Sequence, residues 1–236
     1  MKYLQLLIKL LITFMLAASF FIAGCSSDTI TEAPVPNITT TDSDGATSVD
    51  ENALNDVLDT FVPPDDLTPD EIAGLLFMRE EEKLAFDVYI AMFNLGYPKV
   101  FDNISNSEQT HTDAVLALLN KYNIPDPVGN NAEGVFTDPY LQTLYDDLVT
   151  IGSPSLINAL SVGAEIEEID LIDIQEQVDK LEGNEDIAIV YEILMKGSRN
   201  HLRAFVNNLE KQGVDYLPTH LSQEEYDAII NGGLEN

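Results

Sequence analysis

The sequence predicts an all-α protein whose core is a bundle of four long helices. Three observations lead to this fold class. Apolar residues recur at alternating intervals of three and four over four long stretches, which is the spacing of helix faces packed in a bundle. No stretch alternates apolar and polar residues for long enough to predict a strand. The longest connection falls between the second and third long helices, which predicts one crossover.

The first element is a predicted secretory signal over residues 1–24. Lys2 and Lys9 are its only charges, and an apolar run leads to small residues just before Cys25. This order is typical of a bacterial lipoprotein signal that is cut before a cysteine whose thiol then carries the lipid. The alternative is a transmembrane anchor, since Leu4–Ala23 is nearly long enough to span a bilayer. Both interpretations place the rest of the chain outside the cytoplasm, in the bacterial cell envelope and held at a membrane.

Residues 25–66 are predicted to form a mostly disordered acidic tether between the membrane and the folded domain. The segment is rich in Thr, Ser, Asp and Pro and has few large apolar residues. Within it, Leu54, Val57, Leu58 and Phe61 have helical spacing, so a short helix over residues 50–61 is compatible with the sequence.

The helical domain is predicted over residues 67–236, which is long enough for one core. Its first helix starts at a capping box, in which Thr68 caps the helix and Glu71 completes the box. A second capping box, Ser222 with Glu225, opens a short C-terminal helix. The expected helices are 68–94, 105–122, a short crossover helix 139–152, 153–181, 185–212 and 222–230.

Composition limits the partners that this chain can have. The net charge is −30, so we expect repulsion of nucleic acid and attraction of cations. Cys25 is the only cysteine, and lipidation would consume it, so disulfides and zinc–sulfur sites are excluded from the domain. Any bound metal must therefore be held by oxygen and nitrogen atoms.

Each bundle-facing stripe is interrupted by polar residues near the middle of its helix, where the four stripes converge. Isolated buried carboxylates are costly, and several in one place repel each other. A divalent cation removes both problems, so the stripes predict an inter-helix site for one or two ions, with iron or manganese favoured. The predicted ligands are Glu82, Glu108, His111, Glu167, Asp170 and His201.

Several strings resemble known proteins. Glu82 followed seven residues later by Tyr89 resembles the first-helix metal motif of ferritins, and Glu108-x-x-His111 resembles the second-helix motif. More specifically, the domain resembles an uncharacterised family of ferritin-like domains, domain of unknown function 2202. This resemblance implies a ferritin-like fold and no established activity. It rests on residues 79–89, 107–111, 134–139 and 197–205.

The sequence departs from the di-iron pattern at one position. Ser198 stands three residues before His201, where the pattern has a bridging glutamate. Asp170, from the neighbouring helix, is the candidate replacement, and the alternatives are a single metal ion or no metal. Tyr89, Ser198 and Arg79 are the expected neighbours of the site.

Two functions follow from this pattern. The first is a metal-binding domain, with oxidation of the metal or chemistry on oxygen or peroxide as the reaction class. The second is a non-catalytic interaction or cation-binding protein, whose inward acids are neutralised by Arg79, Arg199 and Arg203. No phosphate loop or nucleophile elbow supports a hydrolase.

Overall fold

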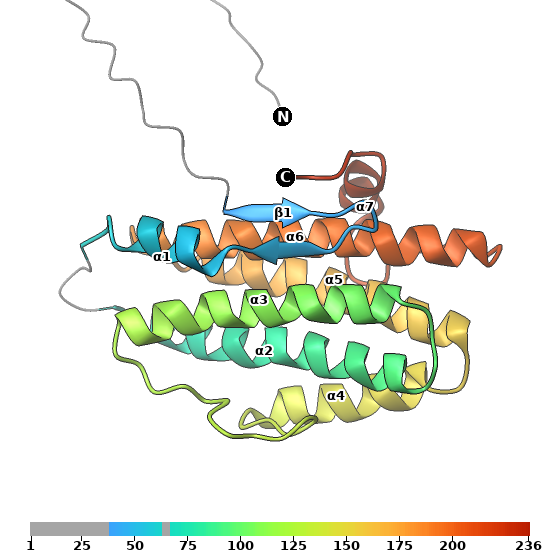
Figure 1. Ribbon diagram of the computed structural model, residues 1–236, viewed down its shortest axis with the longest axis horizontal. Coiled ribbons are helices and arrows are strands. Elements are labelled where there is room, and N and C mark those ends of the chain that lie inside the picture. The colour runs from blue at the N-terminus through green and yellow to red at the C-terminus, as the bar shows by residue number, and fades with distance from the viewer. Residues whose placement is uncertain (1–37, 63–66) are drawn as a thin grey trace, which may run out of the picture. The chain divides into compact units, whose positions relative to one another are not determined.

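The computed structural model describes residues 38–62 and 67–236 of the chain. Its described part is mainly helical, which confirms the predicted all-α class. Four long helices run along one another in two antiparallel pairs (Figure 1). Helix α2 pairs with α3, and α5 pairs with α6. These helices are α2 Pro69–Asn94, α3 Val100–Lys121, α5 Leu156–Val178 and α6 Glu185–Lys211.

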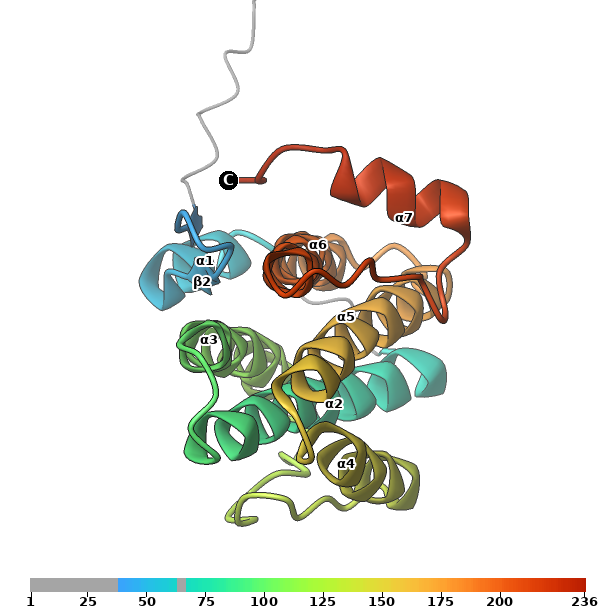
Figure 2. The ribbon, with the colours of Figure 1, turned by 90° about the vertical axis from the view of Figure 1, so that its right-hand side faces the viewer.

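The crossover connects α3 to α5 and carries the short helix α4, Pro139–Gly152, as predicted. Helix α4 packs against α2 and α5, on the side of the bundle away from α6 (Figure 2). The buried Glu80 carboxylate accepts hydrogen bonds from the backbone N–H groups of Thr137 and Asp138. One glutamate of α2 therefore fixes the loop that enters α4.

Helix boundaries follow the predicted caps at α2 and at the C-terminal helix α7, Gln223–Ile230. Both capping boxes are present, with Thr68 and Ser222 as the capping residues. Helix α3 begins five residues earlier than predicted, at Val100. The reason is tertiary packing: Val100 and Phe101 are buried in the core, which holds this first turn although no side chain caps it.

The N-terminal part of the described chain differs from the predicted tether. Strand β1, Thr39–Thr41, pairs antiparallel with β2, Thr47–Val49, and the helix α1, Glu51–Leu58, follows. Strand β2 contacts α3 and α6, and α1 contacts α3 (Figure 1). The short α1 agrees with the helix considered for residues 50–61. The predicted signal, residues 1–24, and Cys25 lie outside the described residues.

The N-terminal segment folds because several of its few apolar side chains are buried against the bundle. Leu54 and Leu58 of α1 are buried in the same cluster as Val115 of α3, and Ile38 and Val49 join them. Such a small number of apolar residues gives little periodic signal in the sequence, yet these four side chains cover surface that the bundle would otherwise expose to water.

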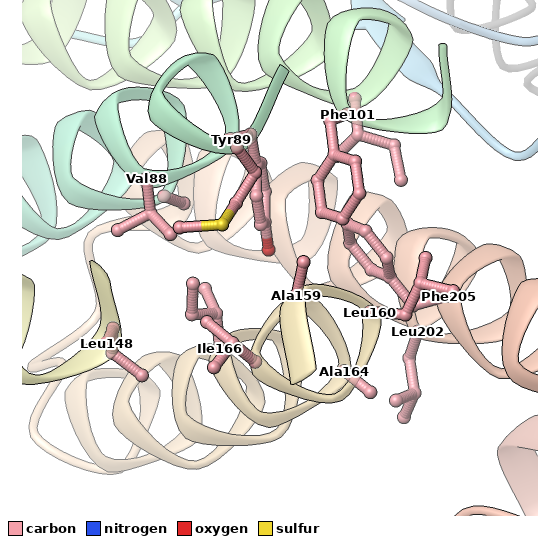
Figure 3. Packing of buried hydrophobic residues seen from close by; sticks show 14 of the residues in the cluster. Val88, Tyr89, Phe101, Leu148, Ala159, Leu160, Ala164, Ile166, Leu202 and Phe205 are labelled. Atoms are coloured by element: carbon pink, nitrogen blue, oxygen red, sulfur yellow. The ribbon is translucent and has the colours of Figure 1, made fainter. Parts of the chain in front are cut away.

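The hydrophobic core is divided into two clusters along the bundle. One contains Tyr89, Phe101 and Phe205, whose rings pack closely, with 5.1 Å between the centroids of Tyr89 and Phe205 (Figure 3). The other contains Leu75 and Val115. On α2, α3 and α6, the predicted polar residues lie between the stretches that enter these two clusters. On α5, Glu167 and Asp170 lie between Ile166 and Leu171, at the end of the stretch that enters the first cluster. None of the described helices has the length and hydropathy needed to cross a membrane.

Candidate metal centre

The centre of the polar layer is the carboxylate of Glu108. Its Oε2 lies 2.8 Å from Nδ1 of His111, and its Oε1 lies 2.8 Å from Nδ1 of His201. His111 reaches the carboxylate from one turn along α3, because residues three apart share a helix face. His201 reaches it from α6, and the two imidazole rings stack with 5.4 Å between their centroids. All three side chains are buried.

Two further carboxylates flank the two histidines, one beside each ring. Oε2 of Glu82 on α2 lies 3.4 Å from Nδ1 of His111, and Oε2 of Glu167 on α5 lies 3.5 Å from Nδ1 of His201. The hydroxyl of Tyr89 donates to Oε1 of Glu167 at 2.6 Å. Each Nδ1 atom therefore faces two carboxylates, and Glu108 belongs to both groups.

Asp170 completes the set of buried acids. The hydroxyl of Ser198 on α6 donates to its carboxylate across the gap between α5 and α6. Burial raises the pKa of Asp170 well above its usual range, and the nearby carboxylates of Glu82 and Glu167 raise it further. Ser198, which occupies the position of the bridging glutamate in the di-iron pattern, is thus hydrogen-bonded to another carboxylate of the same layer, Asp170. All six predicted ligands are buried in this layer.

The arginines do not neutralise these acids. Arg79 pairs with Asp126, at 3.1 Å, and donates to the backbone carbonyl of Thr112. Arg199 and Arg203 both pair with Glu235 near the C-terminus. In the described part of the chain, the only basic side chains within ion-pair distance of the predicted ligands are His111 and His201. This is a correction to the predicted role of the three arginines in compensating the inward acids.

The charges of the site are coupled. Burial opposes ionisation of Glu108, but the positive charges of His201 and His111 outweigh it and hold its pKa far below the usual range. Burial lowers the pKa of His201, yet Glu108 and Glu167 raise it to about 9. Burial raises the pKa of Glu82 to about 8 and that of Glu167 to about 7, although each faces a histidine. Without a metal, the raised pKa values of Glu82, Glu167 and His201 favour their protonated forms near neutral pH. These protons offset the negative charge that a bound metal ion would otherwise offset.

The donor set fits a divalent transition metal. One ligand atom each from Glu108, His111 and His201 lie within 4.8 Å of one another. Mixed carboxylate and imidazole donors are suited to iron and manganese, and the absence of thiolates excludes sulfur-rich sites. Oε1 of Glu82 is buried and has no hydrogen-bond partner among the described residues. Nδ1 of His201 is also buried, and its 2.8 Å contact with Oε1 of Glu108 is not aligned as a hydrogen bond. Buried polar atoms without an aligned hydrogen bond are expected where an ion belongs.

The other ring nitrogens of the histidines face two residues that the sequence did not predict for the site. Nε2 of His111 lies 2.9 Å from the backbone oxygen of Thr47, in β2. Nε2 of His201 lies 2.9 Å from the hydroxyl oxygen of Ser107 on α3. Ser107 precedes the Glu108 motif and could have been found from it. Thr47 gave no signal, because it contributes a backbone atom from within the predicted tether.

A glycine of α6 gives His111 the space it occupies. A Cβ atom on Gly197 would lie 2.2 Å from Cε1 of His111 and 2.7 Å from its Nε2. Real Cβ atoms do not approach so closely, so the imidazole requires glycine at this position. A glycine inside a long predicted helix is the signal that could have indicated this close approach.

A further buried acid, Glu81, lies beside the centre on the α4 side. It lines a small cavity together with Asp170. Neither of its carboxylate oxygens has a hydrogen-bond partner among the described residues. Burial raises its pKa well above the usual range, and the charges of Asp170 and Asp173 act in the same direction. Both effects favour the neutral form of Glu81.

The comparisons with known proteins agree with this architecture. Residues 71–233 match the family described as an uncharacterized protein domain, DUF2202. The chain belongs to this family. Its six predicted metal ligands all lie within the matched residues, whereas the hairpin and α1 lie outside them.

One relative has both a curated sequence and a solved structure. The chain is 51% identical over 174 residues to the uncharacterized protein MJ0754 of the archaeon Methanocaldococcus jannaschii, which covers 74% of this chain and 94% of the relative. The crystal structure of that hypothetical protein, titled as from Methanococcus jannaschii, aligns with a TM-score of 0.72 at 50% identity, covering 74% of this chain and 99% of the other. Because this relative is archaeal, it gives no support to the bacterial origin or the lipid anchor, which stay predictions.

The metal-free protein is expected to lose stability as the pH rises from about 5 to about 9. Glu82 and Glu167 ionise near 4.5 when unfolded but at about 8 and about 7 when folded, so unfolding becomes easier as pH rises through this interval. The stabilisation from protonated His201 is complete below 6.5 and is lost as pH rises through about 9. Both changes have the same sign. Thermal melting in the presence of a chelator measures the effect.

A Glu82→Gln variant serves as the internal comparison for this pH dependence. It removes one of the groups whose pKa is raised, so the decline in Tm between pH 5 and 8 should become shallower. A Tm that stays constant or increases over this interval in the unsubstituted protein would contradict the charge assignment.

Proposed function

We propose that this chain is a metal-binding protein with a ferritin-like bundle, which holds one or two divalent iron or manganese ions between its four long helices. The observation that carries the proposal is that the Nδ1 atoms of two imidazoles each lie 2.8 Å from one shared carboxylate. Among the described residues, no arginine or lysine lies within ion-pair distance of the acids in this layer. The proposed ligands are Glu82, Glu108, His111, Glu167, Asp170 and His201.

The arrangement supports two half-sites that share Glu108. Glu82 and His111 would hold one ion, and Glu167 and His201 the other, with Glu108 between them. Ferrous iron in such a site supplies electrons to oxygen or peroxide. The chain's own residues exclude bulk water, since every proposed ligand is buried, and they release protons from Nδ1 as the metal enters.

Tyr89 is proposed to orient one half of the site. Its hydroxyl donates to Oε1 of Glu167, which turns Oε2 of the same carboxylate toward His201. The tyrosine is buried among aromatic rings of the neighbouring cluster, so its hydroxyl has a fixed direction. Tyr89 is also the proposed electron source next to the site, through its contact with Glu167.

The test is metal binding by the chelator-treated protein. We expect one or two equivalents of Fe(II) or Mn(II) by elemental analysis after anaerobic loading, and anomalous scattering from crystals at the centre of the polar layer. His111→Ala should abolish or strongly reduce binding. His220→Ala is the matched control, because His220 is exposed and outside the layer. Zero stoichiometry in the unsubstituted protein, or equal stoichiometry in both variants, would refute the proposal.

A second candidate is cation binding without turnover, with the protein acting in the envelope as a lipid-anchored buffer or interaction module. Ser198 favours it, because a hydroxyl replaces the second bridging carboxylate of the di-iron pattern. Oxygen consumption after Fe(II) addition separates the two candidates. Binding without consumption above that of free Fe(II) supports the buffer, and consumption that is lost in His111→Ala supports the catalytic function.

A further inference from the structure

The N-terminal hairpin, residues 39–49, reaches the metal centre through the backbone of one residue. The oxygen of Thr47 contacts Nε2 of His111 at 2.9 Å and accepts a hydrogen bond from the hydroxyl of Ser107. The N–H of Thr47 donates to the same hydroxyl oxygen at 3.0 Å. Thr47 is fully buried, and it is the place where the hairpin meets both α3 and α6.

These contacts decide which ring nitrogen of His111 keeps a proton. A carbonyl oxygen only accepts hydrogen bonds, so the Nε2 atom facing Thr47 must carry its hydrogen. When one nitrogen of an imidazole is protonated and bonded in this way, the other offers its lone pair to a metal. Nδ1 of His111 is thereby left as the metal-binding atom, and it points toward Glu108 and Glu82.

The same reasoning extends to His201 through Ser107. The single hydroxyl hydrogen of Ser107 is used on the oxygen of Thr47, so its oxygen can only accept from Nε2 of His201. The N–H of Thr47 also lies 3.4 Å from this nitrogen, but its distance to the Ser107 oxygen is shorter, at 3.0 Å. Nδ1 of His201 is then free for a metal.

The hairpin is held in this position by specific contacts. The amide of Asn200 on α6 donates to the side-chain oxygen of Thr47 at 2.9 Å, and the N–H of Val49 donates to Thr110 on α3 at 2.9 Å. At the turn, Gly45 has a φ of +91° and lies so close to α6 that a Cβ would be 2.8 Å from the backbone oxygen of Asn200. The turn therefore needs glycine both for its backbone conformation and for its approach to the helix.

We infer that the N-terminal hairpin is part of the metal centre, with Thr47 and Ser107 as positioning residues that keep both histidines in the tautomer that binds metal through Nδ1. This inference rests on the proposed metal-binding function. Residues 39–49 lie outside the part of the chain that matches the family. Metal affinity in this chain then depends on a segment that precedes the bundle.

Gly45→Ala tests the role of the hairpin, because the added methyl group pushes the turn away from Asn200. Gly213→Ala is the matched control: its φ of +75° gives a similar backbone strain, but a Cβ there has no atom within 4 Å. We expect the dissociation constant for Mn(II) to rise by about tenfold to a hundredfold in Gly45→Ala, the range typical when a hydrogen bond to a metal-binding histidine is lost. Metal release to a chelator should also be faster. Gly213→Ala should retain the affinity of the unsubstituted protein.

A second pair of variants gives a test if the hairpin variant does not fold. Ser107→Ala removes the acceptor of His201, whereas Ser105→Ala removes an equally buried hydroxyl that only bonds within α3, to Asp102. Only Ser107→Ala should weaken Mn(II) binding. Equal affinities in the Gly45 and Gly213 variants, or in the two serine variants, would overturn the inference.

Imidazole ¹⁵N NMR of the metal-free protein separates this inference from the proposed function. A slowly exchanging Nε2–H signal of His111 is expected in the unsubstituted protein and in Gly213→Ala, and its loss is expected in Gly45→Ala. If no variant binds metal but this signal behaves as expected, the proposed function fails and the positioning by the hairpin holds. If metal binds but the signal and the affinity are the same in both glycine variants, the positioning fails and the proposed function holds.

Discussion

Replacing Glu108 by glutamine is expected to abolish metal binding and to destabilise the metal-free protein by about 3 kcal/mol, the scale of a broken buried ion pair. This carboxylate contacts Nδ1 of both histidines at 2.8 Å, so it is the counter-ion of two buried imidazoliums at once. Glutamine keeps the size and loses the charge. Elemental analysis gives the metal content, and urea unfolding at pH 7 gives the free energy of unfolding.

Glu192→Gln provides the control for the same chemical change at the surface. Glu192 also pairs with a basic residue, Arg199, but its side chain is 58% exposed. Exposed ion pairs contribute on the order of 0 to 1 kcal/mol, so little change is expected. If Glu108→Gln kept its metal, or lost no more stability than Glu192→Gln, Glu108 would not be the bridge of the site.

Gly197→Ala is expected to remove metal binding through steric displacement of His111. Alanine is usually favoured over glycine inside a helix by about 1 kcal/mol, so the substitution should stabilise an ordinary helix. Here the new methyl group would lie 2.2 Å from the imidazole, which is buried and cannot move away without leaving Glu108. We expect a net destabilisation of about 1 to 3 kcal/mol, as for other overpacked cores, together with the loss of bound metal.

Gly74→Ala in α2 is the matched comparison for this steric effect. A Cβ at Gly74 would also be too close to another atom, 2.8 Å from Oε1 of Gln177, but that atom is the end of a flexible side chain. The control should fold with unchanged or slightly increased stability and retain its metal. Normal metal content in Gly197→Ala would show that His111 does not need its observed position.

Much of the polar layer could be predicted because it depends on helical periodicity alone. Glu82, Glu108, His111 and His201 each fall on the apolar stripe of their own helix, and a stripe fixes the direction of a side chain before the partner helix is known. The same reasoning indicated Glu167 and Asp170 on α5. Their convergence in one layer followed from the antiparallel packing of helices of similar length.

The partners of the charged residues could not be predicted in this way. Arg79 pairs with Asp126 in the crossover, and Arg203 pairs with Glu235 near the C-terminus. These pairs join residues that are far apart in the chain, and their choice depends on distances that only the packed structure sets. The acids of the centre therefore lack the arginine neutralisation that the sequence suggested as an alternative.

By itself, the sequence determined the helical class, the four stripes and the identity of the buried acids and imidazoles, because each of these follows from local spacing along one chain segment. The tertiary structure alone decided that residues 38–62 pack on the bundle and that the oxygen of Thr47 meets His111. A backbone carbonyl is the same in every residue, so no choice of amino acid reveals which carbonyl will be used. The carbonyl that contacts His111 depends on the position of the hairpin against α3 and α6. Packing between distant parts of the chain sets that position.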